Sequence, residues 1–172
     1  MMTNQPDGLI IQDLLLSTRD TFYQIDALLI TDNSIFLYEI KNNSVCYNFK
    51  ERTIYSTSGH ALLDPVAQAE LKRSYLFNLL MNMGHHIEVI PLVIYINPVF
   101  YIYDFPINKS VIFSGQLTSH FKTVSAEVSK PTVLSKTLAE KLVRLYNELY
   151  RPLNLSNYTF DLLQKGIVCP DC

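Results

Sequence analysis

Tyr23 to Lys41 reads YQIDALLITDNSIFLYEIK, two runs rich in Ile, Leu, Phe and Tyr joined by Thr31-Asp32-Asn33-Ser34. Apolar runs of this kind on either side of Asp and Asn turn residues predict an antiparallel hairpin. With Asp32 and Asn33 as a two-residue loop, the numbers of paired residues sum to 65, so Asp26 faces Glu39. We expect this hairpin to form the centre of the fold.

Three charged residues, Asp26, Glu39 and Lys41, interrupt these apolar runs. Because side chains alternate faces along a strand, all three would share one face with Gln24. That face continues toward the turn as Leu28, Ile30, Ile35 and Leu37, and the other face would hold Tyr23, Ile25, Leu29, Phe36, Tyr38 and Ile40. The pattern predicts a hairpin that is covered on both sides and polar at one end of one face.

The negative charges of the expected pair of carboxylates, Asp26 and Glu39, need a compensating positive charge. Like charges opposed across an antiparallel pair repel, and burying an ionised group costs several kcal/mol unless it is paired. Mg²⁺ accepts one or two carboxylates, with water and substrate phosphate completing its shell. We therefore expect a divalent cation between the two carboxylates, with Lys41 orienting the attacking water or offsetting charge on a phosphate.

Asp26, twelve intervening residues and Glu39-Ile40-Lys41 resemble the D…(D/E)xK motif of the PD-(D/E)xK nuclease superfamily. The strings QIDALLI, LYEIKN and, further on, DPVAQ are similar to the nuclease-related domain family called NERD, over roughly Leu9 to Leu80. The residues alone leave an alternative, in which Asp26 ends a strand and Glu39 and Lys41 form a solvated pair at a sheet edge.

The resemblance implies an α/β fold with a restriction-endonuclease-like core. In that core a mixed central sheet, made of an antiparallel meander and a parallel crossover strand, is flanked by helices. The resemblance implies catalytic roles for Asp26, Glu39, Lys41 and Gln68, and a Mg²⁺ or Mn²⁺ ion held by Asp26, Glu39 and the backbone carbonyl of Ile40. It also implies cleavage of nucleic acid, with DNA as the expected partner, in DNA processing or defence.

The other elements are predicted from local patterns. Asp64 and Pro65 are typical of a helix start, and we expect that helix to run to about Met83, before Gly84. Its Gln68 either belongs to the site or is an exposed residue of the first turn, with Lys72 and Tyr75 on the same side of the helix. The other expected elements are strands at Leu9–Leu16, Ile87–Ile96 and Val111–Phe113, a hairpin arm or loop at residues 45–58, a loop or edge strand at Val99–Phe105, and helices at Gln116–Val128 and Ser135–Tyr150.

Connection rules place the strand Ile87–Ile96. It is nearly continuous Val, Ile and Leu, which is typical of a central strand covered on both sides. Since a helix precedes it, a right-handed crossover should bring it parallel to one strand of the hairpin.

The chain departs from the resembling pattern at both ends. Related nucleases commonly begin with a helix that carries a Glu to the metal, and here about eight polar residues precede the first strand, which leaves Glu70 or Asp13 as substitutes. Cys169 and Cys172 form half of a zinc ribbon. They could bind Zn²⁺ in a homodimer, or in a longer parent chain or complex, or remain a bare surface CxxC pair. We expect a nuclease-like domain at 1–165 and a zinc-ribbon start or tail at 166–172.

Composition sets the remaining bounds. The chain has 172 residues, of which 48% are hydrophobic and 17% charged, and a formal net charge of −2. These values suit one domain that contacts nucleic acid through a local basic groove rather than a general basic field. The polar start lacks a signal peptide, and the apolar stretch near Ile87 to Ile96 is too short to span a membrane, so we expect a cytoplasmic protein with no membrane partner.

Two functions from different classes stay open. The first is a metal-dependent nuclease. The second is a catalytically inactive module that keeps the nuclease fold and binds nucleic acid or a protein partner, which the missing Glu and the unfinished zinc motif favour. Other chemistries lack support, because the chain has no Gly-rich phosphate loop, no nucleophile elbow and no HExxH motif.

Overall fold

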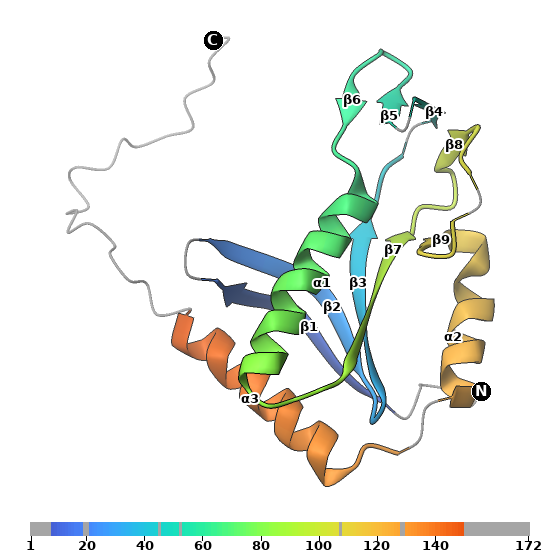
Figure 1. The fold of residues 1–172 in the computed structure, drawn as a ribbon. Coiled ribbons are helices and arrows are strands. Elements are labelled where there is room, and N and C mark those ends of the chain that lie inside the picture. The colour runs from blue at the N-terminus through green and yellow to red at the C-terminus, as the bar shows by residue number, and fades with distance from the viewer. Residues whose placement is uncertain are drawn as a thin grey trace, which may run out of the picture.

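A five-stranded mixed sheet forms the centre of the molecule (Figure 1). The computed structural model describes residues 8–18, 21–44, 46–51, 53–106, 108–127 and 130–149. The sheet has the order β1-β2-β3-β7-β9 and consists of β1 (Leu9–Ser17), β2 (Phe22–Ile30), β3 (Ser34–Lys41), β7 (Glu88–Tyr95) and β9 (Val111–Phe113).

The strand directions confirm the predicted fold class. β1, β2 and β3 form an antiparallel meander, and β7 is parallel to β3 and to β9. The crossover between β3 and β7 contains α1 (Pro65–Asn82), as predicted. This mixed sheet with flanking helices is consistent with a restriction-endonuclease-like fold.

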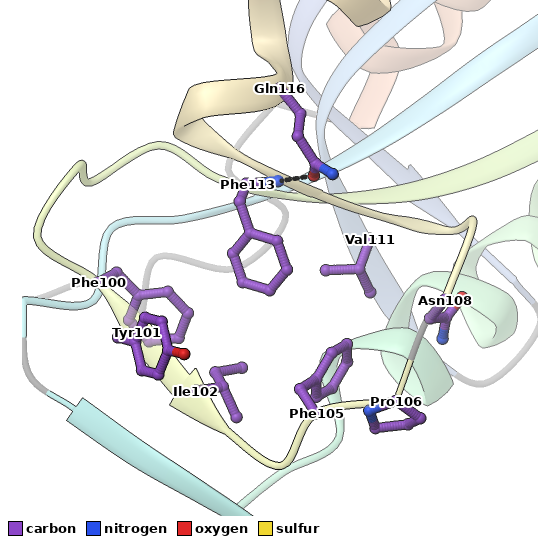
Figure 2. Close-up of a pocket in the computed structure, with 9 residues that line it drawn as sticks. All are labelled: Phe100, Tyr101, Ile102, Phe105, Pro106, Asn108, Val111, Phe113 and Gln116. Carbon is purple, nitrogen blue, oxygen red and sulfur yellow. Dashed lines mark hydrogen bonds between the residues drawn. The ribbon is translucent and has the colours of Figure 1, made fainter.

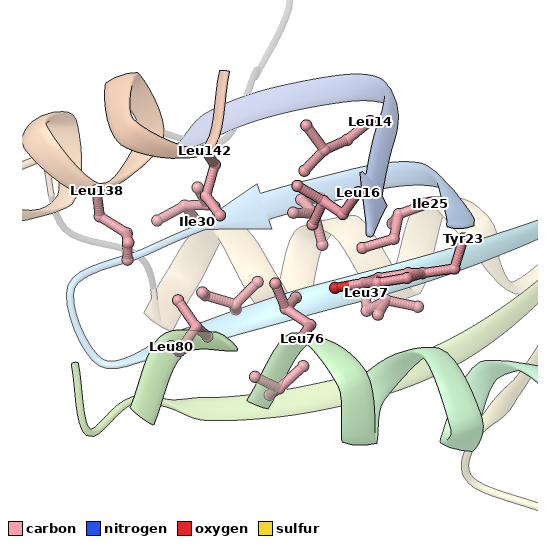
Figure 3. Packing of buried hydrophobic residues seen from close by; sticks show 13 residues of the cluster. Leu14, Leu16, Tyr23, Ile25, Ile30, Leu37, Leu76, Leu80, Leu138 and Leu142 are labelled. Carbon is pink, nitrogen blue, oxygen red and sulfur yellow. The ribbon is translucent and has the colours of Figure 1, made fainter. Parts of the chain in front are cut away.

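Helices cover both faces of the large sheet. α1 and α3 (Val133–Leu149) pack on one face, where Leu76, Leu80, Leu138 and Leu142 meet side chains of β1, β2 and β3 (Figure 3). α2 (Leu117–Glu127) packs on the other face through Val124 and Leu117. Every helix within the described residues is too short or too polar to traverse a membrane.

A second, smaller sheet stands at the end of the large one where β3 and β7 finish (Figure 1). Its order is β6-β5-β4-β8, with β4 (Cys46–Lys50), β5 (Thr53–Ser56), β6 (Ala61–Leu62) and β8 (Tyr101–Tyr103). Residues 45–58 thus contain a hairpin, and the segment predicted as a loop or edge strand pairs with it in parallel. The sheet was not predicted, because its strands are short and come from distant parts of the chain.

The caps of α1 follow the prediction. Asp64 is the N-cap, and its carboxylate accepts a hydrogen bond of 2.9 Å from the Val66 N–H. Pro65 occupies the first turn, where its missing N–H costs no helical hydrogen bond. The helix ends at Asn82, and Gly84 follows with φ of +78°, a conformation that glycine adopts without strain.

The predicted register of the central hairpin is correct near its turn. Ala27 pairs with Tyr38 and Ile30 with Ile35, and the Thr31 N–H donates to the Ser34 carbonyl across the loop. The ladder ends at Ala27–Tyr38, however, so Asp26 and Glu39 do not form the predicted opposed pair.

A kink in β1 and β2 also changes which face the start of β2 presents. Tyr23 and Ile25 lie in the same core cluster as Leu28 and Ile30, whereas strict alternation placed them on opposite faces. The β1–β2 ladder is interrupted at Asp13 and Asp26, and Asp13 has a left-handed φ of +51°. Since a residue in this conformation breaks the two-residue period of a strand, the alternation restarts on either side of it.

Candidate functional site

Glu39 and Lys41 lie at the end of β3, beside the first turns of α1. The Glu39 side chain is 5% exposed, although it is ionisable. The Lys41 ammonium donates a hydrogen bond of 2.7 Å to Glu39 Oε1. A residue two positions along the same strand therefore compensates one carboxylate oxygen.

α1 supplies the other partners of this cluster. Gln68 Oε1 accepts a hydrogen bond of 3.2 Å from Lys41, and the Lys72 ammonium donates to Glu39 Oε2. Gln68 and Lys72 are one helical turn apart and project from the same side of α1. The structure thus brings three of the four predicted catalytic residues, Glu39, Lys41 and Gln68, into one hydrogen-bonded group.

Lys72 is the site residue for which sequence reasoning predicted no role. The helical spacing placed it beside Gln68, four residues away, and that spacing was the available signal. Nothing local indicated that its ammonium would reach a carboxylate 33 positions earlier in the chain. The contact depends on how α1 packs across β3, which is a tertiary property.

Asp26, the fourth predicted catalytic residue, has a different position from the one predicted. Its Oδ2 accepts a hydrogen bond of 2.7 Å from the Ile40 N–H, the backbone group directly after Glu39. The side chain takes the place of a ladder partner at the point where β2 and β3 separate. Asp26 is therefore tied to the end of β3 through the backbone, and repulsion from Glu39 is not needed to explain its surroundings.

Glu39, Lys41, Gln68 and Lys72 together form the Glu39 cluster. A pocket of about 450 Å³ opens beside it. Its walls come from the start of β2, the end of β3 and the first turns of α1, with Thr21, Phe22, Tyr23, Gln24, Glu39, Lys41, Gln68, Leu71, Lys72 and Tyr75 as lining residues. Two lysines against one glutamate leave this wall with an excess positive charge, which suits an anionic ligand. Leu71 is 52% exposed and lines this pocket.

Tyr23 is a largely buried residue of the pocket lining. Its ring packs 5.2 Å from that of Tyr75, and burial raises the pKa of its hydroxyl well above the usual range. The hydroxyl is directed into the core near Leu37 and has no hydrogen-bond partner among the described residues (Figure 3). Tyr23 thus shapes the pocket wall and remains protonated.

Glu70 and Asp13, which were expected to substitute for the helix-borne Glu of related nucleases, do not join the site. Glu70 is on an exposed part of α1 and pairs with Arg73 at 3.8 Å. Asp13 accepts a hydrogen bond of 3.3 Å from Gln24, which lines the pocket, but Asp13 is not itself part of the lining. Cys169 and Cys172 lie outside the described residues, as does the 166–172 tail.

The donor set fits a hard cation that is bound largely through water and ligand oxygens. Among the described residues no group of three or more His, Cys, Asp or Glu side chains could hold a metal ion. Asp26 accepts a hydrogen bond from the N–H of Ile40, the residue directly after Glu39, so both carboxylates lie at the end of β3, and the Ile40 carbonyl is the further oxygen that the sequence predicts. Mg²⁺ usually takes one or two carboxylates and keeps several waters, so this set is small but of the right chemistry.

A second pocket, of about 440 Å³, lies where β8 and β9 meet (Figure 2). Phe100, Phe105 and Phe113 line it with aliphatic neighbours, and Gln116 Oε1 accepts a hydrogen bond from the Phe113 N–H at its rim. Its described lining includes no carboxylate, lysine or histidine. The groups suited to phosphodiester chemistry are therefore those around Glu39.

The fold and the site together define a class of protein. A mixed sheet that presents an Asp from one strand and a Glu-x-Lys from the next is the arrangement of the PD-(D/E)xK-like nucleases. A family model described as nuclease-related domain matches residues 2–96, more than half of the chain. The chain belongs to this family, called NERD, and through it to the PD-(D/E)xK-like nuclease superfamily.

The family match runs from the N-terminus to the residue after β7. It therefore includes the whole meander, α1 and the crossover strand, and all four residues predicted to be catalytic. Comparisons with curated proteins and with solved structures gave no match.

Proposed function

We propose that this protein is a metal-dependent nuclease that hydrolyses phosphodiester bonds in DNA. The observation that carries the proposal is the buried Glu39, joined to Lys41 and Gln68 beside an open, positively charged pocket. The burial of this carboxylate requires an explanation, because removing a charge from water costs free energy. Membership of a nuclease-related family supports phosphodiester hydrolysis as the reaction.

Asp26, Glu39 and the Ile40 carbonyl are the groups that would hold Mg²⁺ or Mn²⁺. When bound, such an ion would act as a Lewis acid, which polarises the scissile phosphate and favours ionisation of the attacking water. The hydrogen bond from the Ile40 N–H fixes Asp26 against the end of β3, which limits the positions that its free oxygen can occupy. The carboxylates are thus oriented by the backbone of the sheet.

Lys41 acts on the reacting phosphate, and Gln68 positions Lys41. The Lys41 ammonium can donate hydrogen bonds to a phosphate oxygen or to the attacking water, where negative charge grows in the transition state. Gln68 accepts from Lys41 and so holds that ammonium at the mouth of the pocket. We assign Gln68 as a positioning residue on this basis.

A cleavage assay tests the proposal. The wild type should cleave single-stranded, duplex or branched DNA with Mn²⁺ present and not with a chelator. Glu39→Gln and Lys41→Met should each lower the rate by about 100-fold or more. Glu70→Gln is the matched control, because Glu70 is exposed on α1 and its side chain forms a long ion pair with Arg73, away from the pocket lining. Equal rates in Glu39→Gln and Glu70→Gln would refute the catalytic assignment.

The second candidate is an inactive module that binds nucleic acid or a protein. One observation favours it: both Glu39 oxygens already accept hydrogen bonds from lysine ammonium groups, so the buried carboxylate is compensated without an ion. A module of this kind would bind DNA with no cleavage and with no dependence on Mn²⁺. Calorimetric titration of Mn²⁺ separates the two candidates, since an affinity that is lost in Glu39→Gln supports the enzyme.

A further inference from the structure

The Glu39 carboxylate has a full set of cationic partners. Lys41 occupies Oε1 and Lys72 occupies Oε2, and the side chains of the two lysines are 29% and 19% exposed. The carboxylate itself is 5% exposed. Such a group is stable without a bound ion, because two charge-assisted hydrogen bonds replace its lost hydration.

The proposed function requires Glu39 to give an oxygen to a divalent cation. An ammonium and a divalent cation repel each other at contact distance, so both cannot occupy the same oxygen at full strength. We therefore expect the cation to displace one of the two lysines when it binds. The exchange involves the side chains of this chain and is a consequence of their present contacts.

The contacts indicate which lysine moves. Lys41 is held at two points, by Glu39 and by Gln68. Among the described residues, Glu39 is the hydrogen-bond partner of Lys72, and no second one holds it. Lys72 also lies on α1 and lines the pocket, so a change of its side-chain rotamer can direct its ammonium to the space beside Gln24 and Thr21.

We infer that Lys72 is an exchange residue, which neutralises Glu39 before the cation binds and contacts a phosphate of the nucleic acid afterwards. This inference rests on the proposed function and extends it to the order of binding. A phosphodiester draws Lys72 away from Glu39 and frees an oxygen for the cation, and the cation in turn frees Lys72 for the phosphate. The two ligands then bind with positive cooperativity, and by linkage each strengthens the other by the same factor.

A purely structural ion pair predicts the opposite behaviour. If Lys72 only held α1 to β3, its removal would loosen the site and weaken binding of the cation. If it competes with the cation, its removal strengthens that binding. The sign of the change in affinity therefore separates the two roles.

Isothermal titration of Mn²⁺ into the purified protein tests the inference, with and without a DNA oligonucleotide whose linkages are all phosphorothioates. For the wild type we expect DNA to raise the Mn²⁺ affinity. Lys72→Met keeps the length of the side chain and removes its charge. It should bind Mn²⁺ about tenfold more tightly than the wild type without DNA, the effect of one charge-assisted hydrogen bond, and gain little when DNA is added.

Arg73→Met is the matched control. Arg73 is the next residue of α1, contacts Glu70 and lies 6.0 Å from the centre of the Phe77 ring, away from the pocket lining. It should behave as the wild type. Lys72→Gln, which keeps a donor without charge, is the second variant should Lys72→Met fold poorly, and its Mn²⁺ affinity should lie between those of the wild type and Lys72→Met.

The outcomes distinguish this inference from the proposed function. Unchanged or weaker Mn²⁺ binding in both Lys72 variants overturns the exchange role, even if the wild type cleaves DNA. Tighter Mn²⁺ binding in Lys72→Met, together with no cleavage by any variant, supports the exchange and refutes the nuclease. Absence of Mn²⁺ binding in every variant, with and without DNA, overturns both.

Discussion

At the scale of single residues, Glu39 shows how a buried charge can be stable without its expected ligand. From the sequence alone, Asp26 and Glu39 were expected to face and repel each other. In the structure Glu39 pairs with Lys41 and Lys72, and Asp26 accepts from a backbone N–H. We therefore expect removal of Glu39 to cost stability rather than to relieve repulsion.

We expect Glu39→Ala to lower the free energy of unfolding by about 1–3 kcal/mol, because it leaves two partly buried ammonium groups without their partner. Urea denaturation monitored by circular dichroism measures the change. Glu70→Ala should change the same quantity by less than about 0.5 kcal/mol, since Glu70 forms a long, exposed pair. A Glu39→Ala protein as stable as the wild type would mean that repulsion, and not pairing, dominates this site.

Tyr23 offers a second test at the same scale. Its hydroxyl is buried and has no hydrogen-bond partner among the described residues, and leaving such a group unsatisfied is costly. We expect Tyr23→Phe to raise the free energy of unfolding by about 1 kcal/mol. Tyr101→Phe, at an exposed position on β8, should leave the urea midpoint unchanged. A loss of stability in Tyr23→Phe would show that the hydroxyl has a bound partner in solution.

At the scale of elements, α1 connects the fold to the site. It covers β3 and β7 with Leu76 and Leu80, and the same helix projects Gln68 and Lys72 toward β3 from its first two turns. Any change that loosens the start of this helix should therefore also displace Gln68 and Lys72 from their partners in the Glu39 cluster. The N-cap, Asp64, is the natural place to test this coupling.

We expect Asp64→Ala to lower the free energy of unfolding by about 1 kcal/mol, because the Val66 N–H loses its acceptor. Asp64→Ser keeps a capping oxygen and should retain most of the stability. Both values come from urea denaturation, and calorimetric titration of Mn²⁺ shows whether a frayed first turn weakens the site. Equal stability of the Ala and Ser variants would mean that packing of α1, and not its cap, sets where the helix starts.

The kink at Asp13 and Asp26 is the second feature at this scale. It lets β1 and β2 bury Leu14, Leu16, Tyr23 and Ile25 in the same cluster as the residues nearer the turn. It also coincides with the point where β2 leaves β3 and the Asp26 carboxylate turns to the Ile40 N–H. The same irregularity therefore shapes the core and orients a candidate metal ligand.

At the scale of the whole molecule, α2 closes the face of the sheet opposite α1. The Tyr38 hydroxyl and His120 Nε2 form a hydrogen bond of 3.1 Å between β3 and α2, and Phe121 packs against both rings. Burial lowers the pKa of His120 below its ordinary value of 6.5 and raises that of Tyr38 well above its usual range. His120 is therefore neutral in the folded protein near neutral pH.

This burial predicts how stability depends on pH. The unfolded chain binds a proton on His120 more readily than the folded protein does. Above pH 6.5 His120 is neutral in both states and does not change the free energy of unfolding, and as the pH falls below 6.5 that free energy decreases. Thermal unfolding between pH 5 and 7 should show this decline, and it should be shallower in His120→Gln. Parallel curves for the two proteins would show that His120 is not protected from protonation.

Several features of this protein were predictable from local sequence. Alternation and turn chemistry predicted the Ala27–Ile30 register, and Asp64-Pro65 predicted the start of α1. The apolar run before Ile96 predicted a strand parallel to one strand of the hairpin, and that strand is β3. The resemblance in QIDALLI and LYEIKN predicted the family that the comparison then showed. Each of these depends on residues that are neighbours in the chain or follow a fixed period.

Other features were decided only by the tertiary structure. The Glu39–Lys72 contact and the pairing of β4 with β8 join residues that are distant in the chain, and the kink depends on a left-handed backbone at Asp13 that no local pattern indicated. Such contacts arise only when whole elements pack, because their free energies depend on burial and on partners that no local pattern specifies. The sequence alone therefore determined which residues are candidates for chemistry, and packing decided that a lysine now occupies the carboxylate on which a metal was expected.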